Sequence, residues 1–493
     1  MNSYLLQRSL LLICAIPLPP PPPRRQLKSY IATNLAHMEA VAVNDWINTN
    51  PVFYHEKTGK YSHRLADVID FDSFDWDWVG LRVYLRFGYC ALGLTPIRQV
   101  RFVEACQELV RSKEGRLIAR DLPDTALDLL EGPRTTPEEV LAMLRQQIEN
   151  YLAGAERVSI PLTAGYDSRL LASLVPPQVQ AQNFTFGTTL KPEQDREVLY
   201  ARWISDQLGQ AWQHVPIQDY WAYATQAFPL FSLECNLSYL HYYRFQQQIH
   251  SQGGRGKSLS GLVGDAFAGK FQVPRPRHAA EIDLLTLTHG IHADDTQLRQ
   301  PRAPYEQVVE DYLHRNSDLL AHPQGRIVAL MRNKMMLLKF LTQLPVEMGS
   351  TCLAPYVQPQ VAAAMMRLPE AERRDRLWQR QYFEQRGLIP NRAIRFQKTN
   401  LVQQQAWIHK PGIPLQAELL REILPERYVA RVWQGMPKRL GTPEKSYHYW
   451  MYRLSGHIPA IKKRYFNNSV SHYYTLLPLQ LMIQARNQNV GRG

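Results

Sequence analysis

The sequence predicts an α/β protein, in which a parallel sheet carries helices on both faces beside a helical cap and a small α+β region. Strand-like and helix-like segments alternate from residue 157 to residue 260, which is typical of a parallel sheet. Residues 220–250 and 280–460 are rich in aromatic residues and long apolar helical patterns, which predicts the cap. Residues 38–118 contain short β-prone runs, turns and one helix, which predicts the α+β region.

The composition is that of a globular chain. Of 493 residues, 45% are hydrophobic and 20% charged, and the length accommodates two or three domains of roughly 100–200 residues. No run of about 18 apolar residues occurs, so we expect no membrane span. The 5 cysteines are scattered and form no C-x-x-C pair, which argues against a disulfide framework and a zinc site and favours a reducing compartment.

The chain is basic, with a formal net charge of +13. Such a balance allows nucleic acid, an acidic membrane or an anionic substrate as a partner. The only clusters of Lys and Arg that we find are short, at residues 373–380 and 462–464. We therefore expect a solvated basic surface rather than a dedicated nucleic-acid interface.

Residues 1–30 are expected to form a disordered, proline-rich tail. The apolar run from Leu10 to Ile16 follows Arg8, as in the hydrophobic part of a signal peptide, but no small-residue cleavage site follows it cleanly. Consecutive prolines from Pro19 to Pro23 favour a polyproline-type segment. A start codon placed inside a longer reading frame is the alternative interpretation.

The region 31–130 is the predicted α+β domain. Strand-like runs cover Ala40–Val43 and Pro51–Tyr54, and residues 56–60 suit a hairpin loop. Apolar residues recur at helical spacing from Trp78 to Phe87. The sequence Glu131-Gly132-Pro133 marks the boundary that follows.

The main domain is predicted at residues 135–460, with a C-terminal extension at 461–493. Its first helix starts at Thr135-Thr136-Pro137-Glu138-Glu139, where a threonine cap, a proline in the first turn and early acids agree. The alternating segments that follow are strands at 157–162, 183–186, 214–217 and 257–260, and helices at 168–174 and 193–208.

The candidate functional loop is the segment 163–168, Thr-Ala-Gly-Tyr-Asp-Ser, between a predicted strand and a predicted helix. In this geometry, backbone N–H groups point at one spot and the helix dipole favours an anion there. Asp167 would repel a bare phosphate, so it indicates a magnesium ion that bridges to the phosphate. The loop lacks the Gly-Lys-Ser/Thr ending of a P-loop. An ordinary βα turn is the alternative.

Four segments, in order, resemble those of the asparagine synthetase family. Residues 163–168 resemble its pyrophosphate loop, Ser-Gly-Gly-x-Asp-Ser, and residues 260–265 (Ser-Gly-Leu-Val-Gly-Asp) resemble its Ser-Gly-Glu-Gly-x-Asp-Glu loop. Residues 184–187 with 195–197 resemble its second strand and following helix. The fourth segment, 395–398 (Arg-Phe-Gln-Lys), follows landmarks that resemble the family's at Pro355-Tyr356-Val357 and Leu388-Ile389-Pro390. The resemblance spans about residues 38–410.

The resemblance implies a pyrophosphate-loop fold, of the adenine nucleotide alpha-hydrolase type, that binds ATP and Mg²⁺. Asp167 and Asp265, at neighbouring strand ends, are the implied magnesium ligands, and two carboxylates suit a hard cation that keeps most of its waters. Lys398 is implied to neutralise charge on the leaving pyrophosphate, with a surface lysine as the alternative. The implied nucleotide-binding residues are Leu162, Thr163, Gly165, Asp167, Ser168, Phe186, Ser260 and Gly261.

Leu162 and Phe186 are implied to flank the adenine, and the alternative for each is an ordinary core residue. Next to the loop, Arg169 is a candidate partner for an acidic substrate or for a nearby aspartate.

Other positions depart from the family's pattern. Leu262 stands where the family has a glutamate associated with ammonia passage, and Ala266 where it has another acid, so aspartate and ammonia are doubtful substrates. The family's glutaminase nucleophile is a Cys at the first position, where this chain has Met1. Asn44-Asp45, Pro51–Tyr54 and Phe87-Gly88-Tyr89 with Thr95 are similar to the back half of the family's glutaminase domain. Residues 31–130 thus resemble a truncated, Cys-less glutaminase-like domain of the Ntn type, and we expect no glutamine hydrolysis.

The resemblance implies an ATP-dependent ligase that forms C–N bonds. A carboxylate attacks the α-phosphate of ATP to give an acyl-adenylate and pyrophosphate, and ammonia or an amine then displaces AMP. The expected acceptors are small-molecule, peptide or glycan carboxylates, with a homodimer or a separate ammonia-supplying subunit as possible assemblies and the cytoplasm as location. The alternatives are a catalytically impaired ATP-binding relative and an RNA-modifying enzyme; the absence of cysteine pairs disfavours the second.

Overall fold

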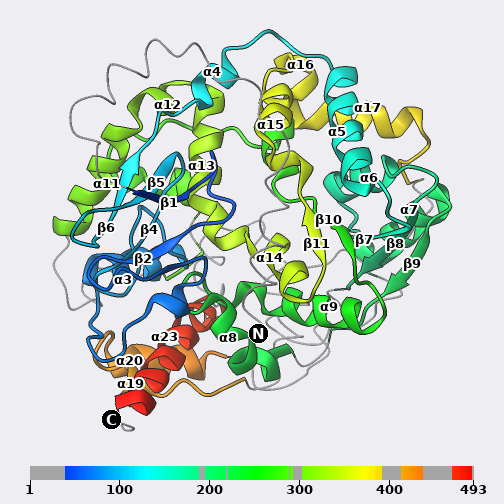
Figure 1. Ribbon diagram of the computed structural model, residues 1–493. Coiled ribbons are helices and arrows are strands. Elements are labelled where there is room, and N and C mark those ends of the chain that lie inside the picture. The colour runs from blue at the N-terminus through cyan, green and yellow to red at the C-terminus, as the bar shows by residue number, and fades with distance from the viewer. Residues whose placement is uncertain are drawn as a thin grey trace, which may run out of the picture.

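The computed structural model describes residues 39–187, 195–217, 220–287, 289–291, 303–390, 412–436 and 469–490. The fold is α/β, with a five-stranded parallel sheet flanked by helices (Figure 1). The predicted tail at 1–30 and the segment 395–398 lie outside the described residues. Within the described ranges, every helix is too short or too polar to cross a membrane.

The parallel sheet has the strand order β11-β10-β7-β8-β9. Three predicted strands are confirmed with small shifts: β7 (Arg157–Pro161), β8 (Gln180–Thr185) and β10 (Lys257–Leu259). The strand predicted at 214–217 is wrong in its bounds. β9 is Ala211–His214, and its first residue pairs with Gln182 of β8. The three-residue strand β11 (Thr351–Leu353) was not predicted.

The helical connections explain where a ligand site forms. Helix α6 (Tyr166–Ser173) joins β7 to β8, and α7 (Arg196–Leu208) joins β8 to β9, so the chain moves in one direction across the sheet. It then passes through α9 (Leu240–Ser251) to β10, on the other side of β7. Because crossovers are right-handed, α9 covers the opposite face from α6 and α7. The order reverses between β7 and β10, where parallel sheets bind ligands past the strand ends.

The N-terminal region contains two antiparallel sheets (Figure 1). One has the order β1-β5-β6 and the other β3-β2-β4, and the loop 56–60 joins β2 to β3 as the hairpin prediction required. The predicted helix 78–87 is confirmed as α3 (Trp78–Phe87), which Asp77 caps by accepting from the backbone N–H of Gly80. The strands are β1 (Glu39–Val43), β2 (Phe53–His55), β3 (Tyr61–Ser62), β4 (Val100–Phe102), β5 (Gln107–Arg111) and β6 (Leu117–Asp121).

Helices dominate the remaining described chain, as predicted for the cap. The last of them, α23, packs into the core, with Leu476, Leu477 and Leu479 fully buried. The helices are α4 (Ala126–Leu130), α5 (Pro137–Leu152), α8 (Ala224–Phe231), α10 (Asp283–Thr286), α11 (Ala303–Arg315), α12 (Ser317–Ala321), α13 (Pro323–Leu338), α14 (Phe340–Glu347), α15 (Pro359–Met366), α16 (Glu370–Arg373), α17 (Leu377–Gln385), α19 (Ala417–Leu420), α20 (Glu426–Gln434) and α23 (Ser469–Val490).

Helix α5 starts where the sequence predicts, and its cap is testable. The Thr136 hydroxyl accepts from the Glu139 backbone N–H, and the Glu139 carboxylate accepts from the Thr136 backbone N–H. We expect Thr136→Ala to lower the free energy of unfolding by about 1 kcal/mol, because one N–H of the first turn loses its partner. Chemical denaturation measures this loss, and Thr136→Ser serves as the control that keeps the hydroxyl. Equal losses in both variants would contradict the capping role.

Candidate functional site

Two loops meet at the switch point of the sheet. The loop 163–168 follows β7 and enters α6, and the segment 260–265 follows β10. They touch directly, since the backbone N–H of Asp265 donates to Oδ2 of Asp167 at 2.9 Å. A Cβ on Gly264 would lie 2.8 Å from Cγ of Asp167, and one on Gly261 would lie 3.2 Å from its Cβ. The two glycines therefore permit the close approach of the loops.

Internal hydrogen bonds fix the shape of the loop 163–168. The Ser168 hydroxyl accepts from the backbone N–H of Thr163 at 3.0 Å, and the Thr163 hydroxyl accepts from that of Gly165 at 3.1 Å. The backbone N–H of Ala164 donates to Oε2 of Glu197, on α7, at 2.7 Å. A carboxylate thus occupies one N–H group of the loop. Burial raises the pKa of Glu197, which makes that carboxylate less costly to protonate or displace.

Asp167 supplies the carboxyl group of the loop, and its surroundings raise its pKa strongly. Its Oδ1 atom is buried without a hydrogen-bond partner among the described residues, and the Nη1 atom of Arg376 is 3.9 Å away, beyond hydrogen-bond range. Burial first, and the charge of Asp265 second, raise the pKa of Asp167 to about 7. A buried carboxylate oxygen without a donor is the kind of group that a cation stabilises.

Two cations pair with the two carboxylates, and the charge of a third, Lys334, interacts with that of Asp265. Nζ of Lys270 is 2.7 Å from Oδ2 of Asp265, and Arg376 lies beside Asp167. Burial lowers the pKa of Lys334, on α13, while the charge of Asp265 opposes that change. None of the three was predicted as a site residue from the sequence. Three positive side chains against two carboxylates leave an excess of one positive charge in this region, which suits an anionic ligand.

Two of these cations, Lys270 and Arg376, lie in backbone segments of irregular conformation. Lys270 ends a π-helical segment, Ala266–Lys270, and such segments are frequent at functional sites. Asp375 and Arg376 have φ angles of 52° and 60°, in the left-handed region that disfavours residues with a Cβ. The Arg376 guanidinium lies 4.6 Å from the ring centre of Tyr166 in the loop. The strained backbone thus holds Arg376 over the start of α6.

Two interpretations of basic residues need correction. Arg169 pairs with no aspartate in the described part of the chain: it is buried and donates to the backbone oxygens of Ala164 at 2.7 Å and Leu388 at 3.0 Å. It therefore anchors the loop. The cluster 373–380 is not wholly a solvated surface, since Arg373 is buried and Arg376 approaches Asp167. Sequence spacing gave no sign of either, because both depend on contacts across the fold.

A cavity of about 440 Å³ opens at this point. All eight residues predicted to bind nucleotide line it, namely Leu162, Thr163, Gly165, Asp167, Ser168, Phe186, Ser260 and Gly261. Part of its wall is aromatic, and the ring centre of Phe186 lies 5.4 Å from that of His241 and 4.9 Å from that of Phe245. Burial lowers the pKa of His241 to about 4, so the ring is neutral near pH 7. A planar, neutral ligand group suits this wall.

The remaining predicted site residues are placed as follows. Asp265 adjoins Asp167 through its backbone, while Lys398 lies outside the described residues. Leu262 and Ala266, the departures from the family's acids, are both buried, and Leu262 lines the cavity. The Tyr356 hydroxyl, which sequence analysis did not assign to the site, donates to the backbone oxygen of Asp167 at 2.9 Å.

The site fits magnesium better than a metal held entirely by protein. No group of three or more His, Cys, Asp or Glu side chains able to hold a metal occurs in the described part of the chain. Asp167 and Asp265 supply two carboxylates, and Oδ1 of Asp167 has no donor among the residues that the structure describes. Magnesium keeps several waters and takes further oxygens from phosphate, so two carboxylates suffice.

Comparison with protein-family models and with curated protein sequences gave no match for this chain.

Proposed function

We propose that this chain is an ATP-dependent ligase that activates a carboxylate as an acyl-adenylate and joins it to ammonia or an amine. The observation that carries the proposal is that all eight predicted residues, six of them from the two loops, line one cavity, beside an aspartate oxygen that is buried without a donor among the described residues. The resemblance of both loops to those of asparagine synthetases supports the same chemistry. We further propose that the sheet is a pyrophosphate-loop fold and that the protein is cytoplasmic.

In this proposal the adenine packs on the aromatic wall and the phosphates approach the start of α6. Phe186 and Leu162 line the part of the cavity that takes the base. The N-terminal N–H groups of α6 attract the phosphates. The backbone N–H of Ala164 donates to the Glu197 carboxylate at 2.7 Å. In the proposed complex a phosphate oxygen replaces that carboxylate as the acceptor.

Asp167 and Asp265 would hold the magnesium ion, which neutralises phosphate charge when it is bound. Lys270 and Arg376 lie beside these carboxylates now, at 2.7 Å and 3.9 Å. When the ion takes over the carboxylates, the two side chains become available to the phosphates, and Lys334 adds a third positive charge nearby. The proposed role of Lys398 is to neutralise the pyrophosphate as well.

The chemistry consists of two displacements. A carboxylate oxygen of the acceptor forms a bond to the α-phosphorus of ATP, and the bond from that phosphorus to the bridging oxygen breaks, so pyrophosphate leaves with the electron pair. The amine nitrogen then bonds to the acyl carbon, AMP leaves, and the amine loses a proton. Fixed N–H groups and cations lower the first barrier, because they stabilise charge that builds on the phosphates.

The acceptor side of the cavity is apolar. Leu262 and Leu341 line it, and Leu262 stands where an asparagine synthetase would place the glutamate next to its ammonia route. We therefore propose an acceptor other than aspartate, drawn from small-molecule, peptide or glycan carboxylates, with an amine or separately supplied ammonia as the nucleophile.

Exchange of labelled pyrophosphate into ATP tests the proposal directly. With a panel of carboxylates, we expect exchange that requires Mg²⁺ and one class of acid. A second candidate, ATP binding without catalysis, is favoured by the buried Leu262 and by the carboxylate of Glu197 on the loop. ATP binding without exchange for any acid would select that candidate, and the absence of ATP binding would contradict both.

Arg376 provides a sharper test of the cation cluster. We expect Arg376→Gln to lower kcat/KM for pyrophosphate release by about 10–100-fold, because one positive charge beside Asp167 is lost. Arg376→Lys should retain part of the activity. The matched control is Arg374→Gln, whose side chain is 63% exposed and pairs with Glu370. Steady-state pyrophosphate release measures all three, and equal activity of the Gln variants would contradict a role for Arg376.

A further inference from the structure

A second cavity, of about 310 Å³, lies between the N-terminal region and the helices α11 and α13. It shares no lining residue with the first cavity. Its volume is at the lower end of the roughly 300–1,000 Å³ range of small-molecule sites. Both signs of charge line it: Glu104, Asp121 and Asp124 come from the N-terminal region, and Arg315 and Arg332 come from the helices.

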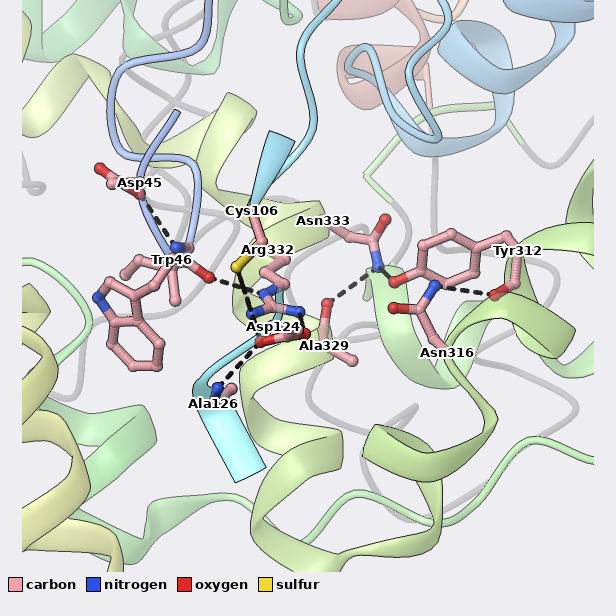
Figure 2. A network of polar contacts seen from close by, with 11 residues as sticks. Asp45, Trp46, Cys106, Asp124, Ala126, Tyr312, Asn316, Ala329, Arg332 and Asn333 are labelled. Atoms are coloured by element: carbon pink, nitrogen blue, oxygen red, sulfur yellow. Dashed lines mark hydrogen bonds and ion pairs between the residues drawn. The ribbon is translucent and has the colours of Figure 1, made fainter. Parts of the chain in front are cut away.

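Asp124 and Arg332 form an ion pair with two hydrogen bonds (Figure 2). Nη1 and Nη2 of Arg332 donate to the two carboxylate oxygens of Asp124 at 2.5 and 2.8 Å. Nη2 also lies 3.4 Å from Sγ of Cys106, and Nε donates to the backbone oxygen of Trp46 at 2.7 Å. These two charged groups already have partners within the protein, so we treat them as a structural part of the cavity wall and not as ligand-binding groups.

Glu104 and Arg315 are less well satisfied. Both terminal nitrogens of Arg315 reach the same oxygen, Oε2 of Glu104, at 3.4 Å, and Oε1 receives no hydrogen bond within the described ranges. Burial raises the pKa of Glu104 although the Arg315 guanidinium opposes that change, while the side chains of Glu104 and Arg315 remain 21% and 50% exposed and therefore open to a ligand. Asn316, beside Arg315, uses its amide N–H₂ group to donate to the backbone oxygen of Tyr312 at 2.9 Å, and that group carries a second N–H.

We propose that this cavity binds a free α-amino acid, whose ammonium pairs with Glu104 and whose carboxylate pairs with Arg315 and Asn316. A carboxylate and a guanidinium side by side match the two opposite charges that an α-amino acid carries on one carbon. A simple amine or a simple acid satisfies only one of the two groups, and when it separates the ion pair it leaves the other group without a counter-charge. The cavity therefore selects the zwitterion by its charge pattern.

The cavity is connected to the candidate active site through Trp46. Its backbone oxygen accepts from Arg332, and its indole N–H donates to the backbone oxygen of Val357 at 2.8 Å. Its ring stacks on that of Phe267, with centres 5.8 Å apart. Val357 follows Tyr356, which holds the Asp167 backbone, and Phe267 belongs to the segment that ends at Lys270. Amino-acid binding is thereby expected to change ATP affinity, a consequence that rests on the proposed function.

Calorimetric titration of the full chain, without nucleotide, tests the site. The twenty common α-amino acids are first screened by thermal shift, and each hit is titrated beside its decarboxylated amine and its deaminated acid. We expect at least one α-amino acid to bind and both analogues to bind about tenfold more weakly or worse. The absence of binding by every α-amino acid at millimolar concentration, or equal binding of an analogue, would overturn the proposal.

Two variants locate the site. Glu104→Gln removes one charge and keeps the shape of the wall, and Arg315→Gln removes the other charge with a shorter polar side chain, so each should weaken binding about tenfold or more. Asp75→Asn is the matched control, because it breaks a surface ion pair with Arg98 whose atoms lie 2.7 Å apart. Circular dichroism checks that every variant is folded. Unchanged affinity in both cavity variants would overturn the assignment.

The link to the active site has its own readout. ATP affinity is measured with and without the bound amino acid, in the wild type and in Trp46→Phe, which removes the indole N–H that donates to Val357. We expect a change in ATP affinity that the variant reduces. If the chain binds no ATP, the proposed function fails, while the nucleotide-free titration still decides the cavity.

Discussion

Asp167→Asn is expected to reduce carboxylate-dependent pyrophosphate release by about 10²–10³-fold. The variant keeps the size of the side chain, but it removes the charge that we propose to hold magnesium at the buried Oδ1 atom. Mg²⁺-dependent ATP binding should weaken in parallel, as measured by calorimetry. Asp206→Asn, at an exposed position on α7, is the control and should retain full activity.

The same variant should change how stability depends on pH. The folded-state pKa of Asp167 is raised to about 7 from an ordinary 3.8, so the folded protein holds this proton in a range where the unfolded chain has released it. The resulting stability is present in full below about pH 4 and is lost as pH rises to about 7. The loss is at most about 4 kcal/mol, since one pKa unit corresponds to about 1.36 kcal/mol.

Denaturant unfolding at several pH values between 4 and 8 measures this effect. The free energy of unfolding of Asp167→Asn should fall less steeply with pH than that of the wild type, and Asp206→Asn should follow the wild type. Saturating Mg²⁺ with ATP should also flatten the wild-type curve, because a bound cation favours the ionised carboxylate. Wild-type ATP turnover by Asp167→Asn would contradict the role assigned to this residue.

Lys339→Met is expected to lower the free energy of unfolding by about 3–5 kcal/mol. Lys339 and Glu234 form an ion pair in the core, where each side chain is only 1% exposed. Glu234 also accepts from the backbone N–H of Leu65 at 2.7 Å, which ties the N-terminal region to this pair. Without the lysine, Glu234 remains as an uncompensated buried carboxylate, whose pKa burial already raises.

A double variant separates the two causes of this loss. Lys339→Met with Glu234→Gln removes both charges, so it should be more stable than Lys339→Met alone, although it buries a new amide. Arg98→Met, in an exposed ion pair with Asp75, is the surface control and should change stability by less than about 1 kcal/mol. A double variant less stable than the single one would show that the lost charge pairing is not the cause.

Local chemistry was enough to predict much of the sheet and part of the site. Hydrophobic runs between turn signals identified β7, β8 and β10, and the period of 3.6 residues identified α3 and the stripe of α5. The eight residues assigned to nucleotide binding lie in three segments, each at the end of one of these strands. Because the ends of adjacent parallel strands share one edge, correct strands brought these residues to one cavity.

The shifted and missed strands have local causes. β11 contains three residues, too few to show the alternation that identifies a strand. β9 is an edge strand whose bounds depend on its register with β8.

The class of the fold, the two loops at the switch point and the residues in those loops could be predicted from the sequence, since each depends on neighbours along the chain. The positions of Lys270 and Arg376 beside the carboxylates, the burial of Arg169 as an anchor and the second charged cavity became visible only in the folded molecule. Long charged side chains carry no periodic signal, and whether each one meets water, a backbone oxygen or a carboxylate depends on how the chain folds around it. Arg169 shows this, because it donates both to Ala164 in its own loop and to Leu388, 219 residues away.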